Sequence, residues 1–235
     1  MQKQAFNIAI DGPAGAGKST IAKTVAKKLG FIYVDTGAMY RAIALFMLRQ
    51  GVDRNDETAV SETVKEAKIT IRYQEGAQQV LLNGEDVSGL IRTEEVGNTA
   101  SAVSAYPAVR AHLLALQREL AASADVLMDG RDIGTCILPD ADAKIFLTAS
   151  SRVRAMRRYK ELTEKGVMCN LEEIEQDIIE RDARDMNREI APLKKAEDAI
   201  LVDSSEMTID QVVQTIMDAA VRCGLPESRA QKGDC

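Results

Sequence analysis

The chain has 235 residues, of which 30 are basic and 36 acidic, so its formal net charge at pH 7 is −6. This length suits one α/β domain with a modest insertion and is short for two independent domains. The acidic balance argues against a broad nucleic-acid surface, and no run of about 18 uncharged apolar residues offers a membrane-spanning helix. We therefore expect a soluble protein that has neither nucleic acid nor a membrane as a partner.

The rarer residues narrow the chemistry further. Cysteines stand at positions 136, 169, 223 and 235, without CxxC spacing or a dense framework, which fits reduced thiols better than disulfides or zinc. Residues 1–6 lead directly into an apolar run without a signal-peptide pattern, so the expected location is the cytoplasm. His112 is the only histidine, which excludes a multi-histidine metal centre, and we expect it to be a surface residue without a role.

The first half of the chain alternates strands with helices. An apolar, β-branched run at 5–10 predicts a strand, glycines punctuate 12–17, and apolar residues at helical spacing predict a helix over 19–29. A second strand is expected at 31–34, followed by a helix at 37–50. This alternation predicts a three-layer α/β fold with a buried parallel sheet between helices. Further core strands are expected at 126–128, 144–147 and 200–202.

The pattern changes between about 62 and 105. Residues 68–73 and 78–82 alternate in the manner of strands, are joined through Glu75-Gly76, and are followed by the turn signal Asn83-Gly84. We interpret this region as a small antiparallel insertion in a domain that covers 1–222. Residues 223–235 are polar and punctuated by glycine and proline, so we expect a flexible tail.

A phosphate-binding loop follows the first strand. The stretch from Gly12 to Ser19 fits GxxxxGK[ST] and lies between an apolar strand and an amphipathic helix, as the mechanism requires. Its backbone N–H groups and the helix N-terminus would cradle phosphates, Lys18 would reach the β- and γ-phosphates, and Ser19 would ligate Mg²⁺. This motif predicts a nucleoside triphosphate as ligand but no particular reaction. The predicted ATP-binding residues here are Gly12, Pro13, Ala14, Gly15, Ala16, Gly17, Lys18, Ser19 and Thr20.

Two further segments place charge at the carboxyl edge of the sheet, where open α/β sheets bind ligands. After the second strand, Thr36 could donate to a phosphate and Arg41 could clamp it, although a helix cap beside a surface arginine explains the same residues. After the strand at 126–128, Asp129 could hold the Mg²⁺ shell through water, and Arg131 could neutralise the phosphoryl group in flight. The alternative there is a turn with a salt bridge.

The second half of the chain adds more arginines. Between 171 and 190, an apolar stripe continues as Arg181, Asp185 and Arg188, which suits nucleotide contacts but also an exposed ion pair. A basic helix start at Arg152, Arg154, Arg157 and Arg158 suggests a lid over the ATP phosphates, at about 151–168, that would exclude water; a solvated basic face is the alternative.

Taken in order, these motifs resemble the bacterial-type cytidylate kinases, P-loop nucleoside monophosphate kinases, across the chain to about residue 222. The resemblance rests on IAIDGPAGAGKST, DTGAMYRA, GEDVSGLIRTEEV, SAVSAYPAVR, DGRDIGT and RDARDMNREIAPL. It implies a central parallel sheet, a short lid, a CMP-binding insertion, and transfer of the ATP γ-phosphoryl group to CMP or dCMP in pyrimidine nucleotide metabolism. Ser19 and Thr36 stand where some members carry Gly and Ser, and both hydroxyls suit the assignment.

The resemblance also implies roles for individual residues. Lys18, Arg41, Asp129 and Arg131 would be catalytic, with Mg²⁺ held by Ser19 and, through water, by Asp129. A carboxylate at Asp132 can accept from the exocyclic amine of cytosine, whereas uracil presents an oxygen there, so UMP should be rejected. The CMP phosphate would be held by Thr36, Arg41 and Arg131, cytosine by Ser101, Arg110 and Asp132, and the ribose by Arg181 and Asp185, with Arg188 nearby.

Two other readings remain open at this point. A related small P-loop kinase could act on adenylate, uridylate or a metabolite such as shikimate, although the DGRD segment and the insertion disfavour it. The second alternative is a regulatory P-loop protein without catalysis. The presence of Lys18 and of several arginines disfavours it. We expect a monomer that binds ATP, Mg²⁺ and the acceptor nucleotide.

Overall fold

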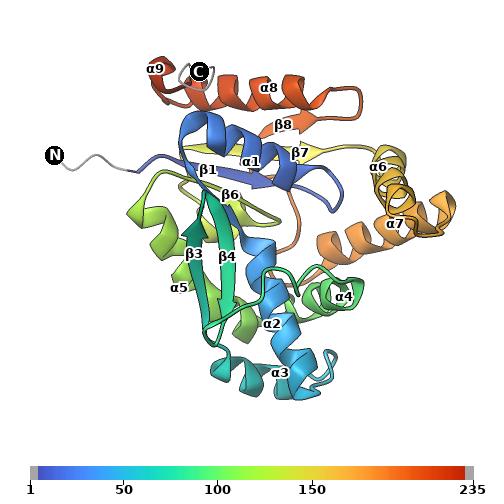
Figure 1. Cartoon of the computed structure of the whole chain (residues 1–235). Coiled ribbons are helices and arrows are strands. Elements are labelled where there is room, and N and C mark those ends of the chain that lie inside the picture. Colours follow the sequence, from blue (N-terminus) through green and yellow to red (C-terminus); the bar gives the residue numbers. More distant parts are fainter. Residues whose placement is uncertain (1–4, 231–235) are drawn as a thin grey trace.

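The computed structural model describes residues 5–230 and has a parallel five-stranded sheet at its centre (Figure 1). The strand order is β2-β6-β1-β7-β8, and every neighbouring pair is parallel. The predicted α/β fold is confirmed, and each predicted core strand lies within two residues of an observed one. The strands are β1 Asn7–Asp11, β2 Ile32–Asp35, β6 Val126–Gly130, β7 Ala143–Thr148 and β8 Ile200–Asp203.

Helices cover both faces of this sheet because its strands are apolar on both sides. Tyr33 and Leu127 pack with helices α1 (Lys18–Leu29) and α8 (Ile209–Arg222). Their chain neighbours Val34 and Met128 point the other way, into a core shared with α2 (Thr36–Gln50) and α5 (Pro107–Ser123). The alternation of successive side chains along each strand thus separates two cores.

The start of α2 is fixed by a side-chain cap. Asp35 precedes the helix, and its carboxylate accepts a hydrogen bond from the Ala38 backbone N–H at 2.8 Å. This cap satisfies one of the free N–H groups of the first helical turn. The helix consequently begins at Thr36, one residue before the predicted start, and it ends at Gln50, followed by Gly51, whose φ of 68° is left-handed.

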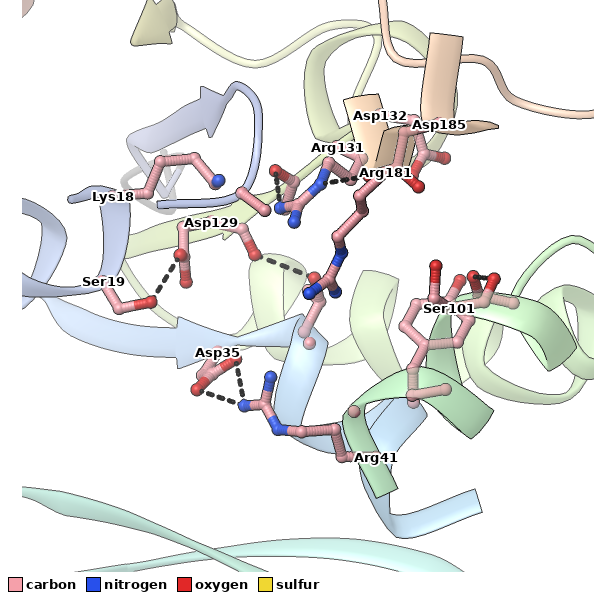
Figure 2. A pocket seen from close by; sticks show the side chains of 18 of the residues that line it. Lys18, Ser19, Asp35, Arg41, Ser101, Asp129, Arg131, Asp132, Arg181 and Asp185 are labelled. Atoms are coloured by element: carbon pink, nitrogen blue, oxygen red, sulfur yellow. Dashed lines mark hydrogen bonds and ion pairs between the residues drawn. The ribbon is translucent and has the colours of Figure 1, made fainter. Parts of the chain in front are cut away.

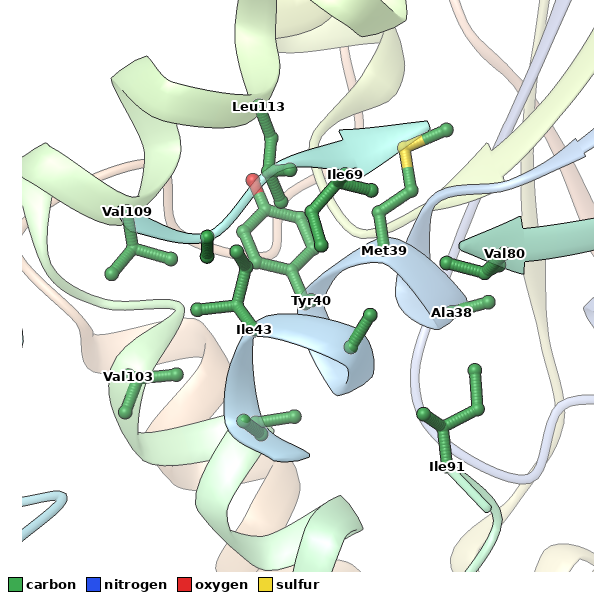
Figure 3. Packing of buried hydrophobic residues seen from close by; sticks show 14 of the residues in the cluster. Ala38, Met39, Tyr40, Ile43, Ile69, Val80, Ile91, Val103, Val109 and Leu113 are labelled. Atoms are coloured by element: carbon green, nitrogen blue, oxygen red, sulfur yellow. The ribbon is translucent and has the colours of Figure 1, made fainter. Parts of the chain in front are cut away.

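The insertion is an antiparallel sheet followed by a helix. Strands β3 (Ile69–Gln74), β4 (Ala77–Leu82) and β5 (Glu85–Asp86) pair in order through turns at the two predicted sites. Figure 3 shows Ile69 and Val80 packed against Met39 and Tyr40 of α2, so the insertion shares one core with the main sheet. Flanking elements are α3 Glu57–Thr63, a short 3₁₀ turn at Val64–Glu66, and α4 Glu94–Val103.

The hairpin also seals the free edge of β2. The Gln78 side chain accepts from the Asp35 backbone N–H at 2.8 Å and donates to the Asp35 carbonyl at 3.2 Å. The Tyr73 hydroxyl donates to the Tyr33 carbonyl at 3.1 Å. Side chains thus complete hydrogen bonds that a neighbouring strand would otherwise make.

The remaining helices lie toward the C-terminus. Helices α6 (Ser151–Glu164) and α7 (Leu171–Asn187) pack on each other and project from the sheet (Figure 1). The predicted lid coincides with α6 and the loop after it, and its closing stays a prediction. Between residues 5 and 230, no helix combines the length and apolar character that crossing a membrane requires.

Residues 223–230, which the sequence analysis assigned to a flexible tail, pack against the domain. Leu225 is buried beside α8, and Arg229, in α9 (Glu227–Ala230), forms an ion pair with Asp125 and lies over the Phe31 ring. A polar, glycine-rich composition did not reveal these long-range contacts. Positions 231–235, with Cys235, lie outside the described residues; the described cysteines are free thiols.

Candidate active site

A polar cavity of about 380 Å³ opens at the carboxyl edge of the sheet (Figure 2). The phosphate loop, the ends of β2 and β6, and helices α4, α5 and α7 all contribute to its walls. One cavity therefore joins the predicted donor and acceptor residues. Its lining includes Ala14, Gly15, Gly17, Lys18, Ser19 and Thr20 on one side and Thr36, Arg41, Ser101, Arg110, Arg131, Asp132, Arg181, Asp185 and Arg188 on the other, with Asp129 between.

The phosphate loop wraps closely because glycine permits it. Gly15 and Gly17 have φ values of 76° and 85°, and a Cβ at Gly12 would lie 1.9 Å from the Leu147 carbonyl oxygen. Lys18 is buried, and its ammonium donates to the carbonyls of Gly12 and Pro13 at 2.7 and 2.8 Å. Burial, then the charge of Arg131, lowers the pKa of Lys18 well below its ordinary value. Gly12, Pro13 and Ala16 shape this loop without lining the cavity.

Asp129 joins the phosphate loop to the sheet. One of its carboxylate oxygens accepts from the Ser19 hydroxyl at 3.0 Å and the other from the Tyr33 hydroxyl at 2.8 Å. Burial and the nearby charge of Asp35 raise the pKa of Asp129 to about 6, against the opposing effect of Lys18. Two oxygen groups, of Ser19 and Asp129, therefore meet where the sequence predicts a Mg²⁺ site, and oxygen is what this ion prefers.

An arginine pair converges on the carboxylate that caps α2. Arg41 donates to both oxygens of Asp35, at 3.0 and 3.3 Å, and Arg92 donates to one of them at 3.2 Å. Thr36 is buried, and its hydroxyl donates to the Asp129 carbonyl at 2.8 Å. Donation from Thr36 to a phosphate stays a prediction, and it requires the hydroxyl to turn away from the Asp129 carbonyl.

Further cationic groups face the centre of the cavity. Arg131 donates from Nε to Asp185 at 3.0 Å, and Figure 2 shows Arg131 and Arg181 extending into the same space as Arg41. Burial lowers the pKa of both Arg181 and Arg188. The positive charge of Arg131 lowers the pKa of Arg181 further, whereas the negative charge of Asp132 partly opposes the shift at Arg188. Buried donors without a hydrogen-bond partner, which an anion would satisfy, are Arg41 Nε, Arg181 Nε and Arg188 Nη2.

The far end of the cavity is built around Asp132. This buried carboxylate forms an ion pair with Arg110 and lies 3.7 Å from Arg188. Arg110 also stacks over the Tyr40 ring, with 5.8 Å from its guanidinium carbon to the ring centroid. Ser101 comes from α4 of the insertion, so the predicted acceptor residues do meet here. The Arg181–Asp185 surface pair is excluded, because Asp185 binds Arg131 instead and is buried.

The arginines of the basic helix, predicted to contact the ATP phosphates, lie outside the cavity in this structure. Arg154 is buried beneath the loop, where it donates to the Ala14 and Ala149 carbonyls and pairs with Asp182 at 2.6 Å. Arg157 binds Ser204, and Arg158 pairs with Glu161 on the surface. None of these three arginines lines the cavity. Helical spacing predicted a shared face but could not identify these partners.

Arg154 should therefore matter chiefly for stability. Arg154→Ala leaves the Asp182 carboxylate buried without its cation, so we expect the free energy of unfolding to fall by about 3 kcal/mol. Urea denaturation followed by circular dichroism measures this loss. Arg158→Ala, on the exposed face of the same helix, is the matched control and should change little. Equal unfolding midpoints for the two variants would contradict the assignment.

Several functional candidates escaped the sequence interpretation. Asp35 entered only through the helix cap given as the alternative for Thr36 and Arg41, and Tyr33, Tyr40 and Arg92 were not singled out. Asp11 is the least visible of them: it is buried and accepts from the backbone N–H groups of residues 133 and 134. A charged residue that ends an otherwise apolar strand, directly before Gly12, is the signal that could have revealed it.

Two buried carboxyls should make stability depend on pH. Burial raises the pKa of Asp11 to about 6, as it does for Asp129. Each carboxyl has a higher pKa in the folded state than in the unfolded state, so its protonated form favours folding. This contribution to the free energy of unfolding is complete below about pH 4 and is lost as the pH rises through about 6. Asparagine at position 129 cannot ionise. We therefore expect the free energy of unfolding of Asp129→Asn, relative to that of the wild type, to rise by on the order of 3 kcal/mol between about pH 4 and pH 6. Urea unfolding at a series of pH values measures the difference, which should not be constant.

A family model and the curated relatives found by sequence point to one family. The model of the cytidylate kinase family matches residues 8–222. Among curated relatives, the cytidylate kinase of Lactobacillus gasseri is 50% identical over 222 residues, which cover 93% of this chain and 96% of the relative. Those of Shouchella clausii and Bacillus thuringiensis are 49% and 52% identical, over 91% and 90% of this chain and 95% and 94% of theirs.

Proposed function

The chain belongs to the cytidylate kinase family, and from that membership we propose that it transfers the γ-phosphoryl group of ATP to CMP or dCMP. The observation that carries the proposal is the single cavity in which a phosphate loop faces a second set of buried charged groups. A triphosphate site alone would serve many reactions, whereas a kinase needs an acceptor site in contact with it.

The donor side would work through position and charge. Phosphoryl transfer needs little covalent help, so cations that surround the moving group supply most of the catalysis. Lys18 would exchange its two carbonyl partners for β- and γ-phosphate oxygens, and Arg41 and Arg131 would neutralise charge from the acceptor side. The buried donors of Arg41 and Arg181 that lack hydrogen-bond partners support an anion between them.

Mg²⁺ would lie beside Ser19 and Asp129. The hydroxyl and carboxylate oxygens already meet at 3.0 Å, which fits an oxygen-preferring ion held partly through water. When bound, the ion would neutralise phosphate charge and help to align the triphosphate. The chain's part is to hold these two oxygens in place, with Tyr33 fixing the other face of the Asp129 carboxylate.

The acceptor side would read the base at Asp132. Its carboxylate can accept from the exocyclic amine of cytosine while Arg110 and Ser101 bind the remaining edge, and a uracil oxygen would be repelled. Arg181 and Asp185 would contact the ribose, with Arg188 beside Asp132. Such a buried polar site loses most when a group is mismatched, so discrimination against UMP of roughly 10⁴-fold is reasonable. We also propose that the protein acts as a monomer in the cytoplasm.

A steady-state assay tests this function. ADP release is coupled to NADH oxidation, with ATP and Mg²⁺ as donor and with CMP, dCMP, UMP and AMP as acceptors. We expect CMP and dCMP to be phosphorylated far faster than UMP or AMP. The substrate assignment is wrong if AMP or UMP exceeds CMP, and a kinase acting on any of these four nucleotides is excluded if ADP release never depends on an acceptor.

A further inference from the structure

Asp11 connects the two halves of the cavity without lining it. The residue ends β1, pairs in register with Gly130 of β6, and directly precedes Gly12, the first residue of the phosphate loop. Its side chain is turned toward the other half. One carboxylate oxygen accepts from the Ile133 backbone N–H and the other from the Gly134 backbone N–H, each at 2.7 Å.

Those two N–H groups begin the turn that follows Asp132. The turn, a single π-helical turn over Ile133–Ile137, is closed by hydrogen bonds from Cys136 and Ile137 to the Asp132 carbonyl. It is also tightly confined. A Cβ added to Gly134 would lie 3.4 Å from an Asp11 oxygen and 3.2 Å from the Lys144 side chain. Asp11 therefore holds the backbone from which the Asp132 carboxylate projects.

Burial of the Asp11 carboxylate should cost free energy of folding. Asp11 is only 5% exposed, and among residues 5–230 no salt bridge reaches its carboxylate. Burying a carboxylate without a paired cation is unfavourable unless hydrogen bonds compensate it. Its two charge-assisted bonds are stronger than neutral ones and fix both the distance and the direction of the turn.

We infer that Asp11 is a positioning residue for the cytosine end of the acceptor site. It sets where Asp132, and with it Arg110 and Arg188, stands relative to the phosphate loop that begins one residue away. This inference rests on the proposed function, since it assigns base recognition to Asp132. It goes beyond that function because Asp11 touches neither nucleotide site.

Asp11→Asn tests the inference with little change of shape. An amide can accept one of the two N–H groups, but its own NH₂ then opposes the other. We expect the KM for CMP to rise by about 10-fold to 100-fold, as for a small misplacement of a substrate contact, while the KM for ATP changes less than about 2-fold. In the protein without nucleotide, hydrogen–deuterium exchange of the 130–138 segment should become faster.

Asp56→Asn is the matched control. Asp56 also accepts from a backbone N–H, that of Ala59 at 2.9 Å, but it lies outside the cavity. The inference is overturned if Asp11→Asn matches this control in both exchange and KM for CMP, or if the KM values for CMP and ATP rise together. Should Asp11→Asn fail to fold, Gly134→Ala crowds the same turn against the Lys144 side chain, at 3.2 Å, and must show the selective loss. Inactivity of the wild type on CMP would overturn the proposed function instead, since the exchange result does not depend on catalysis.

Discussion

Lys18→Ala should lower kcat by about 10³-fold while leaving the fold intact, because one cation at the transferring phosphates is lost from a water-poor site. In the structure the Lys18 ammonium is held by two carbonyls of the phosphate loop and is buried. Its removal takes away charge that no water can replace efficiently. The coupled assay at saturating ATP and CMP measures kcat, and far-ultraviolet circular dichroism checks the fold.

The control for Lys18 lies on the same helix. Lys27→Ala removes an exposed lysine from the last turn of α1, far along the helix from the loop, and should retain wild-type kcat. A folded Lys18→Ala variant with near-normal kcat would exclude the phosphate-loop mechanism. A regulatory protein without catalysis would show no acceptor-dependent ADP release in either variant or in the wild type.

Asp132→Ala should reduce kcat/KM for CMP by about 10³-fold and abolish most discrimination against UMP, with little change in the KM for ATP. The carboxylate is buried between Arg110 and Arg188, where it holds both cations and offers an acceptor to the base. Without it the two guanidinium groups repel each other, and the site no longer distinguishes an amine from an oxygen. Rates with CMP and UMP, each over a range of ATP, measure the effect.

Asp140→Ala provides the comparison for Asp132. Asp140 is exposed, and it lies shortly after the turn that Asp132 begins. Its loss should leave both selectivity and ATP affinity unchanged. If Asp132→Ala weakened CMP and ATP equally, Asp132 would be a general structural residue and base recognition would have to lie elsewhere.

The sequence predicted best where the chemistry is local. The phosphate loop is contiguous, so Lys18 and Ser19 were placed together by eight residues of pattern. Asp129 and Asp132 followed because the end of a buried parallel strand fixes which edge of the sheet a residue reaches. These predictions needed no knowledge of distant partners.

The sequence predicted least where a side chain can bind one of several distant partners. Arg154 was expected over the phosphates, yet Asp182 and the Ala14 carbonyl hold it beneath the loop. Arginine has a long stem and several donors, so helical position alone does not fix its target. The partner of the Thr36 hydroxyl was not foreseen for the same reason, because this acceptor, the Asp129 carbonyl, is 93 residues away. Asp11 was missed because the phosphate-loop pattern begins at Gly12 and gives the residue before it no role.

The contacts that Tyr73 of β3 and Gln78 of β4 make with β2 give the insertion a second effect. An open edge strand exposes backbone groups that can recruit strands of other molecules and begin aggregation. Here the hairpin occupies the outer hydrogen bonds of β2 at Tyr33 and Asp35. If the hairpin detached from β2, these backbone groups would be exposed and could pair with strands of other molecules. Self-association should therefore increase whenever the hairpin detaches.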